Sequence, residues 1–142
     1  MIVKDIMTED PVSISPDATA EEAAKIMRTK KVGSLLVLVD KKLLGIVTDR
    51  MIVTEIVASG LNAREVKVGG IMHESVVSVP PEMEAAKAAK LLEELEIRYL
   101  PVVVDGKVVG ILSISDIANF VKDFIDCILI ELGARVAKKK EK

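Results

Sequence analysis

The chain has 142 residues, of which 50% are hydrophobic and 30% are charged, and its formal net charge is −2. A chain this apolar can bury enough surface to fold, which excludes a disordered protein. The near-neutral charge and the low aromatic content of 2% argue against a nucleic-acid partner or an anionic membrane surface.

The cysteine and histidine counts and the hydropathy pattern limit the compartment and the kinds of site that we expect. Cys127 is the only cysteine, so no disulfide can form within the chain, which suits a reducing compartment. No apolar run approaches the ~20 residues of a membrane-spanning helix, and no signal peptide is visible. We therefore expect a cytoplasmic protein. His73 is the only histidine, and we expect no metal site.

The sequence contains an internal repeat with an offset of 65 residues. Residues 6–52 and 71–117 align without a gap and are identical at 18 of 47 positions, which far exceeds chance. Two copies are too few for a solenoid, so we expect them to close on each other about a pseudo-twofold axis. The predicted boundaries are 1–60 for the first repeat, 61–69 for a linker, 70–124 for the second repeat, and 125–142 for a C-terminal helix extension with a basic tail.

The first repeat is predicted to follow the order β-α-β-β-α. Its predicted elements are a strand at 12–15, a helix from Thr19, strands at 34–39 and 43–48, and a helix from 49 to about 60. Thr19 and Glu22 form the pattern of a capping box, and alanines recur behind them at helical spacing. The run at 34–39 is continuously apolar, which indicates a strand buried on both faces.

The second repeat is predicted to follow the same order. Its predicted elements are a strand at 76–79, a helix after Pro80-Pro81, strands at 99–104 and 107–113, and a helix from 114 past Leu132. Asp105-Gly106 is a strong hairpin signal between the two later strands. The last helix has a wide apolar stripe formed by Ile117, Val121, Phe124, Ile125, Ile128 and Leu132. We expect part of this stripe to be buried against a second chain, as in a homodimer.

Short motifs recur at both ends of each repeat. The repeats open with Asp5-Ile-Met-Thr8 and Gly70-Ile-Met-His73, and they close with Gly45-Ile-Val-Thr48 and Gly110-Ile-Leu-Ser113. In two copies and in register, these residues closely resemble the CBS domain, named after cystathionine β-synthase, in its tandem arrangement, the Bateman module. The resemblance covers about residues 1–124. It implies an α/β (α+β) fold in which two β-α-β-β-α repeats pack sheet to sheet about a pseudo-twofold axis.

The resemblance also implies a function. CBS pairs are regulatory binding modules and not enzymes. They commonly bind adenosine-containing ligands, such as AMP, ADP, ATP or S-adenosylmethionine, in clefts between the repeats and transmit that signal to a protein partner. In agreement, no catalytic constellation and no phosphate-binding loop is apparent. The alternative is a structural module for dimerisation or partner docking, with vestigial clefts.

The segment Gly110-Ile-Leu-Ser113-Ile-Ser115-Asp116 matches the ligand motif of the family. A carboxylate at Asp116 can accept from both ribose hydroxyls, and the hydroxyls of Ser113 and Ser115 can donate to a phosphate or carboxylate. Ser113 and Asp116 also suit a helix N-cap. Met51 stands at the position equivalent to Asp116, so we expect unequal clefts, of which the one at Asp116 is the better adenosine site.

The resemblance places further residues at each cleft. The Asp116 cleft is expected to comprise Ser113, Ser115 and Asp116 with Met7, Asp10, Val12, Gly33, Ser34 and Leu36. There the backbone near Asp10 and Val12 would contact the adenine edge, and Leu36 or Val12 would pack on its face. The Met51 cleft is expected to comprise Thr48, Arg50, Val77, Arg98, Tyr99 and Pro101. Arg98 would contact a phosphate, although an exposed arginine more often forms a surface ion pair.

Overall fold

The structure, a computed structural model, describes the backbone of residues 1–140 and the side chains of residues 1–133. The helices are α1 (Ala20–Lys30), α2 (Asp49–Ile52), α3 (Ala85–Glu94) and α4 (Ile114–Lys140). The strands are β1 (Thr8–Glu9), β2 (Ser13–Ile14), β3 (Ser34–Val39), β4 (Lys42–Thr48), β5 (Tyr99–Val104) and β6 (Lys107–Ser113). The side chains of the predicted basic tail, Lys138–Lys142, lie outside the described part.

The first repeat forms its helices and strands where the sequence predicts them. The capping box at α1 is confirmed: the Glu22 N–H donates to Thr19 Oγ1 at 3.2 Å, and the Thr19 N–H donates to Glu22 Oε2 at 3.0 Å. Strand β3 has the predicted bounds, and its first four residues are buried. Helix α2 continues as a π-helical turn, Val53–Val57, before the chain turns at Gly60 with φ 67°.

The second repeat reproduces this order except at its first strand. Strands β5 and β6 have the predicted bounds. Of the predicted strand at 76–79, only Val79 pairs, in a parallel bridge with Val102. Pro80 and Pro81 follow at once, and because proline has no N–H the ladder cannot continue through them.

The strands form one curled sheet in the order β1-β6-β4-β3-β2, and β5 pairs with β6 as well. Each repeat contributes an antiparallel hairpin, β3–β4 or β5–β6. The two hairpins meet through a single pair, Lys42 with Lys107. The predicted α+β class and the duplicated architecture are therefore confirmed.

The opening segment of each repeat pairs with the last strand of the other repeat. Thr8 in β1 is the antiparallel partner of Ile111 in β6. Its equivalent 65 residues later, His73, forms the matching bridge with Ile46 in β4. The pseudo-twofold relation expected from the sequence is therefore visible in the backbone hydrogen bonds themselves.

The core is divided into two clusters that exchange one residue each. Val3 lies in the cluster of the second repeat, with Val79, Ala88, Leu92, Leu100, Val102 and Leu112. Val68 lies in the cluster of the first repeat, with Ile14, Ala23, Met27, Leu35, Val37 and Val47. Both valines are fully buried. Each core cluster thus contains a valine that precedes the first strand of the other repeat. The residue boundaries predicted for the repeats and the linker stay a prediction.

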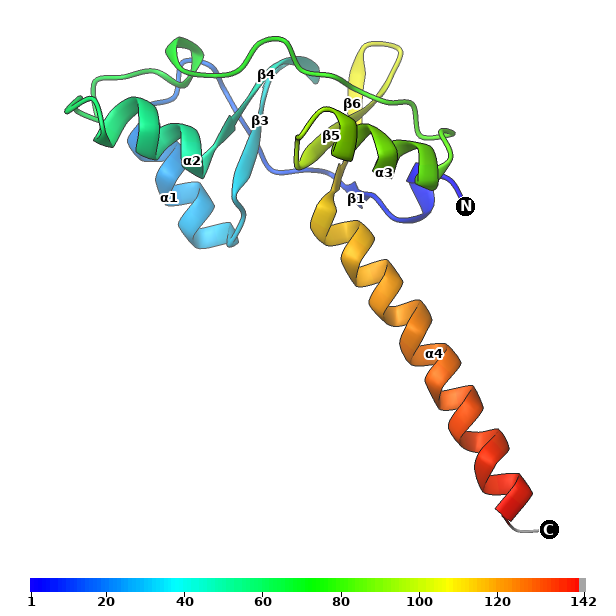
Figure 1. The fold of residues 1–142 in the computed structure, drawn as a ribbon. Helices are drawn as coiled ribbons and strands as arrows, with labels where there is room; N and C mark the ends of the chain where they lie inside the picture. Colours follow the sequence, from blue (N-terminus) through cyan, green and yellow to red (C-terminus); the bar gives the residue numbers. More distant parts are fainter. Residues whose placement is uncertain (141–142) are drawn as a thin grey trace.

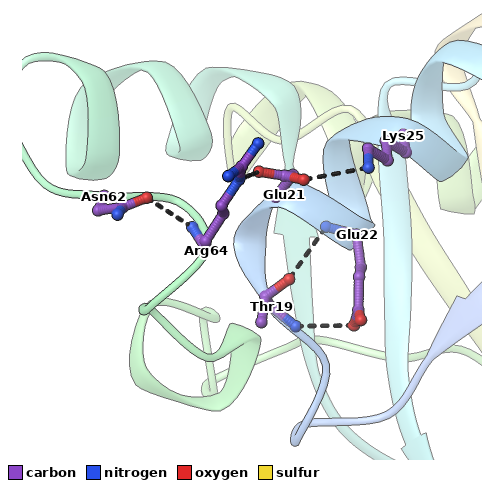
Figure 2. A network of polar contacts seen from close by, with 6 residues as sticks. All are labelled: Thr19, Glu21, Glu22, Lys25, Asn62 and Arg64. Atoms are coloured by element: carbon purple, nitrogen blue, oxygen red, sulfur yellow. Dashed lines mark hydrogen bonds and ion pairs between the residues drawn. The ribbon is translucent and has the colours of Figure 1, made fainter.

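The segment between the repeats is attached to the first turn of α1 (Figure 2). Arg64 Nε lies 2.8 Å from Glu21 Oε2, and Lys25 Nζ lies 3.0 Å from Glu21 Oε1. The hydrogen bond from Arg64, and secondarily that from Lys25, lowers the pKa of the Glu21 carboxyl below its ordinary value. The linker is therefore held against the helix by charge as well as by backbone bonds from Ala20 and Glu21.

Helix α4 leaves the body of the protein and projects away from it (Figure 1). Ile117 in its first turns packs against the second core cluster. Beyond it, a run of large apolar side chains is exposed, namely Val121, Phe124, Ile125, Ile128, Leu129, Ile130 and Leu132. The burial of this stripe against a second chain stays a prediction. Among the described residues, no helix combines the length and apolarity needed to cross a bilayer.

Candidate functional site

The smaller of two clefts lies between the opening segment of the first repeat and the start of α4. Its volume is about 270 Å³. Of the residues assigned to the Asp116 cleft from sequence, those that line it are Asp10, Val12, Gly33, Ser34, Ser113, Ser115 and Asp116. The cleft thus joins segments from both repeats, because β1 pairs with β6 next to the start of α4.

The Asp116 carboxylate is held from two sides. Its Oδ2 accepts from the Ser113 N–H at 2.8 Å, while Ser113 Oγ accepts from the Asp116 N–H at 3.0 Å. Its Oδ1 accepts from the Thr8 hydroxyl at 3.0 Å. The N-capping role is therefore observed. Because each carboxylate oxygen has two lone pairs, the same group can still accept hydrogen bonds from a ligand.

Met7 and Leu36, which were assigned to this cleft, lie elsewhere. A Cβ atom placed on Gly110 would lie 2.6 Å from Met7 Sδ, so the Met7 side chain fills the space over that glycine and packs against the core. Leu36 is on the same face of β3 as Ser34 but two residues deeper, where it is fully buried. Neither side chain lines the cleft.

Thr8, which belongs to the opening segment expected to face Asp116, also lines this cleft, as do Lys31 and Tyr99, which were not assigned to it from the sequence. Lys31 is the C-cap of α1 in the left-handed conformation, with φ 55°. That turn directs the chain back toward β3 and brings Lys31 to the cleft wall. A positive φ at a lysine has no clear sequence signal. The equivalent residue of the second repeat, Glu96, has nearly the same φ, 53°.

The larger cleft has a volume of about 500 Å³ and lies at the pseudo-symmetric position. Of the residues assigned to the Met51 cleft, Thr48, Arg50, Val77, Arg98 and Tyr99 line it, together with Met51. Pro101 does not line it, because it is fully buried in β5. Pro101 is 65 residues after Leu36, so the same position of the repeat lies too deep in both halves.

The Met51 cleft lacks the polar anchor of its counterpart. The Met51 N–H donates to Thr48 Oγ1 at 3.2 Å, which reproduces one half of the Ser113–Asp116 cap. Met51 has no carboxylate to complete it, and His73 stands where Thr8 stands in the other cleft. The predicted inequality of the two clefts thus has a structural basis, although the cleft without the carboxylate is the larger one.

The two clefts share a wall. Tyr99 lines both of them. A Cβ atom on Gly33 would lie 3.2 Å from the Tyr99 hydroxyl and 3.2 Å from Asp49 Oδ2. The Asp49 N–H also donates to the Gly33 carbonyl at 3.0 Å. Gly33 lines the Asp116 cleft and Asp49 lines the Met51 cleft, so this hydrogen bond joins the two sites.

The duplicated sequence, the exchanged core residues and the paired clefts agree with a family match. Residues 3–58 and 68–123 each match the CBS domain. The chain belongs to the CBS-domain family. Its two CBS domains stand in tandem, and the match extends over most of the described residues.

Individual CBS-domain proteins are similar to this chain over most of its length. It is 38% identical over 117 residues to the Methanopyrus kandleri protein MK0525, covering 81% of this chain and 60% of that one. It is 35% identical over 116 residues to the Bacillus subtilis protein YhcV, covering 82% of each. The hexameric CBS-CP12 protein from bloom-forming cyanobacteria has a similar structure, with TM-score 0.77 and 34% identity, over 89% of this chain and 74% of that one.

CBS-domain proteins are in general regulatory modules. A structural neighbour from Burkholderia ambifaria, with TM-score 0.80 and 28% identity over 85% of this chain and 93% of that one, is described as a signal-transduction protein with CBS domains. Enzymes that match this chain do so over only 22–24% of their own length, where the CBS domains are a regulatory part.

Proposed function

We propose that this CBS pair is a ligand sensor that binds an adenosine-containing molecule in the Asp116 cleft and transmits its presence to a protein partner. The candidate ligands are AMP, ADP, ATP and S-adenosylmethionine. The observation that carries the proposal is the Asp116 carboxylate, which is held by Ser113 and Thr8 at a cleft between the repeats.

A carboxylate held in this way suits the recognition of a ribose. Two acceptor oxygens can receive both vicinal hydroxyls in charge-assisted hydrogen bonds. Since Ser113 and Thr8 already fix its orientation, little side-chain freedom is lost when the ligand binds. Lys31 adds a cation to the lining of this cleft, and it can attract the phosphate or carboxylate of a 5′ substituent.

The first-repeat residues Asp10 and Val12 provide a place for the base. The Leu36 N–H donates to the Val12 carbonyl at 3.2 Å, which fixes the backbone of Val12 beside the cleft. Asp10 has φ 49°, a left-handed turn that directs the chain along the cleft. Polar backbone groups near these two residues would contact the edge of the adenine, and the Val12 side chain would contact its face.

Signal transmission follows from the origin of the lining residues. Thr8 and Asp10 come from the first repeat, whereas Ser113 and Asp116 come from the second. A ligand that contacts both groups stabilises the relative orientation in which it binds best. A protein partner that distinguishes the two orientations would then respond to the ligand concentration.

Calorimetric titration with AMP, ATP and S-adenosylmethionine tests the proposal. We expect one of them to bind, and Asp116→Ala to weaken that ligand by at least about tenfold, since a hydrogen bond to a charged group contributes about 1.5–3 kcal/mol. Asp123→Ala, which removes an exposed carboxylate of α4 outside the cleft, is the matched control. Absence of binding by all three at sub-millimolar concentration would contradict the proposal.

A second candidate function is dimerisation or partner docking, and the exposed face of α4 favours it. Phe124 is 58% exposed and Leu129 59% exposed on a helix that projects from the body. We infer a second copy of this chain as the occupant, because an apolar stripe of this length is otherwise left in water. Sedimentation analysis tests it, and a monomer at high micromolar concentration would contradict it.

A further inference from the structure

An apolar groove lies between α3 and the first turns of α4, outside both clefts. Its volume is about 440 Å³. Alanines 85, 86 and 89 of α3 line one side of it, and Ile117 and Phe120 of α4 line the other. Among the described residues of the lining, Glu84 alone has a charged side chain. Because the alanines are small, the groove has room for the side chains of a further helix.

The groove continues into the exposed apolar stripe of α4. Phe120 lines the groove, and its ring stacks on that of Phe124 with the ring centroids 6.3 Å apart. From Phe124 the exposed apolar residues extend to Leu132. Nothing in the described part of the chain covers this surface. The groove and the stripe therefore form one continuous apolar face that begins at the body of the protein and follows α4 outward.

We propose that two copies of this chain pair their α4 helices antiparallel, so that the last turns of each α4 lie in the groove between α3 and α4 of the other copy. This inference rests on the second candidate function, which makes a second copy the occupant of the stripe. It adds the direction of the pairing and a second contact surface. The arrangement is symmetric, since each copy supplies one helix and one groove, as a twofold dimer requires.

The distribution of charge along α4 favours the antiparallel direction. Residues 114–131 include four acidic residues and one lysine, whereas residues 132–140 include one arginine, three lysines and no acidic residue. In a parallel pair the two basic ends would lie side by side and repel each other. In an antiparallel pair each basic end lies beside the acidic half of the other helix and beside Glu84 of its groove. The helix dipoles also attract in this direction.

The overlap of the two stripes sets the register of the pair. The greatest overlap places Val121 of one helix opposite Leu132 of the other. The α4 backbone extends to Lys140, so the last two turns of each helix then continue past Val121 toward the body of the other copy. In this register position 136 lies opposite Ile117, which lines the groove. The length of α4 is therefore sufficient to reach the groove.

The area available for burial agrees with a stable dimer. Six residues of the stripe are between 41% and 59% exposed, namely Val121, Phe124, Ile125, Ile128, Leu129 and Leu132. Covering them in both copies removes on the order of 1,000 Å² from water, which is the size at which specific interfaces begin. The groove adds to this area only in the antiparallel arrangement, because a parallel pair directs both helix ends away from both bodies.

Disulfide cross-linking tests the direction of the pairing. Cys127 is the only cysteine, so Cys127→Ser provides a background without thiols. Val121→Cys and Leu132→Cys are made separately on this background, and one of the two chains carries a size tag. The chains are mixed at high micromolar concentration and oxidised mildly. We expect the mixed disulfide as the main product. Like positions lie about 16 Å apart in this arrangement, which is too far for a disulfide.

The matched control is Asn119→Cys on the same background. Asn119 is exposed on the opposite side of the helix and should give little product with any chain. Disulfides between like positions as the main product would show a parallel pair, which overturns this inference and leaves the second candidate function standing. A monomer in sedimentation analysis, or a dimer that yields none of these products, would overturn both. No ligand takes part, so these outcomes leave the ligand-sensor proposal unaffected.

Charge reversal tests the groove. Glu84→Lys should raise the dimer dissociation constant several-fold at low ionic strength, because it opposes the basic end of the other α4. Adding Lys138→Glu and Lys139→Glu to the same chain should restore the association, which a folding defect could not do. Glu93→Lys makes the same change on α3 outside the groove and is the control. Equal effects of Glu84→Lys and Glu93→Lys, or no restoration, would overturn the groove contact.

Discussion

The Thr8 hydroxyl donates to Asp116 Oδ1 at 3.0 Å, although 108 residues separate the two in the chain. The bond joins the opening segment of the first repeat to the first turn of α4 in the second. At the pseudo-symmetric position, His73 and Met51 provide no such bond. A duplicated chain has therefore placed a polar link between its repeats at one of two equivalent positions.

This link should contribute measurably to stability. Thr8→Val is expected to lower the free energy of unfolding by about 1 kcal/mol, and Asp116→Ala by about 2 kcal/mol, because Asp116 also caps α4. Urea denaturation measures both. Ser115→Ala, which removes an exposed hydroxyl, is the control and should change little. A Thr8→Val effect no larger than the control would show that the link is not formed in solution.

The glycines opposite the opening segments should not tolerate a methyl group. A Cβ on Gly45 would lie 2.7 Å from the His73 carbonyl oxygen, and one on Gly110 would lie 2.6 Å from Met7 Sδ. A backbone oxygen moves less readily than a thioether, so Gly45→Ala should be the more destabilising, by about 2–3 kcal/mol. Thermal unfolding measures it. Gly70→Ala, with no atom within 4 Å, is the control.

Gly33→Ala should alter both clefts at once. Its Cβ would lie 3.2 Å from the Tyr99 hydroxyl and from Asp49 Oδ2, which are the ends of side chains and can move by a few tenths of an ångström. The fold should survive, while the shared wall shifts. We expect AMP to bind about fivefold more weakly, which corresponds to about 1 kcal/mol. Unchanged AMP affinity would show that the shared wall does not affect the Asp116 cleft.

A charge on the exposed face of α4 should prevent self-association. Phe124→Glu is expected to raise the dimer dissociation constant by at least about tenfold, since a carboxylate would have to be buried without a partner. Sedimentation velocity over a concentration series measures this. Asn119→Glu adds the same charge on the opposite side of the helix and should leave the association intact. Equal sedimentation of Phe124→Glu and the unaltered protein would remove the dimer proposal.

The contacts of Glu21 predict a pH-dependent contribution to stability. Its pKa is lower in the folded state than the ordinary value of 4.5, because Arg64 and Lys25 stabilise the charged form. The contribution is therefore present above that value and is lost as the pH falls through the lower pKa of the folded state. Glu21→Gln should be slightly less stable than the unaltered protein at pH 7 and equally stable in strong acid.

Thermal unfolding at a series of pH values measures this difference. Glu65→Gln serves as the control, because it removes an exposed carboxylate that forms no ion pair with any residue whose side chain is described. A stability difference between Glu21→Gln and the unaltered protein that persists in strong acid would contradict the assignment. The effect is small, because Glu21 is partly exposed and solvent screens its interactions with the two cations.

The sequence by itself determined the duplication, the order of elements and the composition of the ligand motif. The capping box at Thr19 and the hairpin at Asp105-Gly106 are local signals, which depend on residues only a few positions apart. The Ser113–Asp116 cap is local too. For this reason these features were correct to within a residue or two. The sequence also predicted that the two clefts differ, because the alignment of the repeats places Met51 at the position of Asp116.

Only the tertiary structure decided which side chains reach the clefts. Leu36 and Pro101 lie on the same strand faces as the cleft residues Ser34 and Tyr99. The alternation of side chains along a strand gives the face, but it does not tell at which residue other elements begin to cover that face. Lys31 reaches the Asp116 cleft through a left-handed turn, and Tyr99 reaches both clefts because the two repeats lie against each other. These positions depend on contacts between residues far apart in the chain. Local patterns, which act over a few residues, cannot specify them.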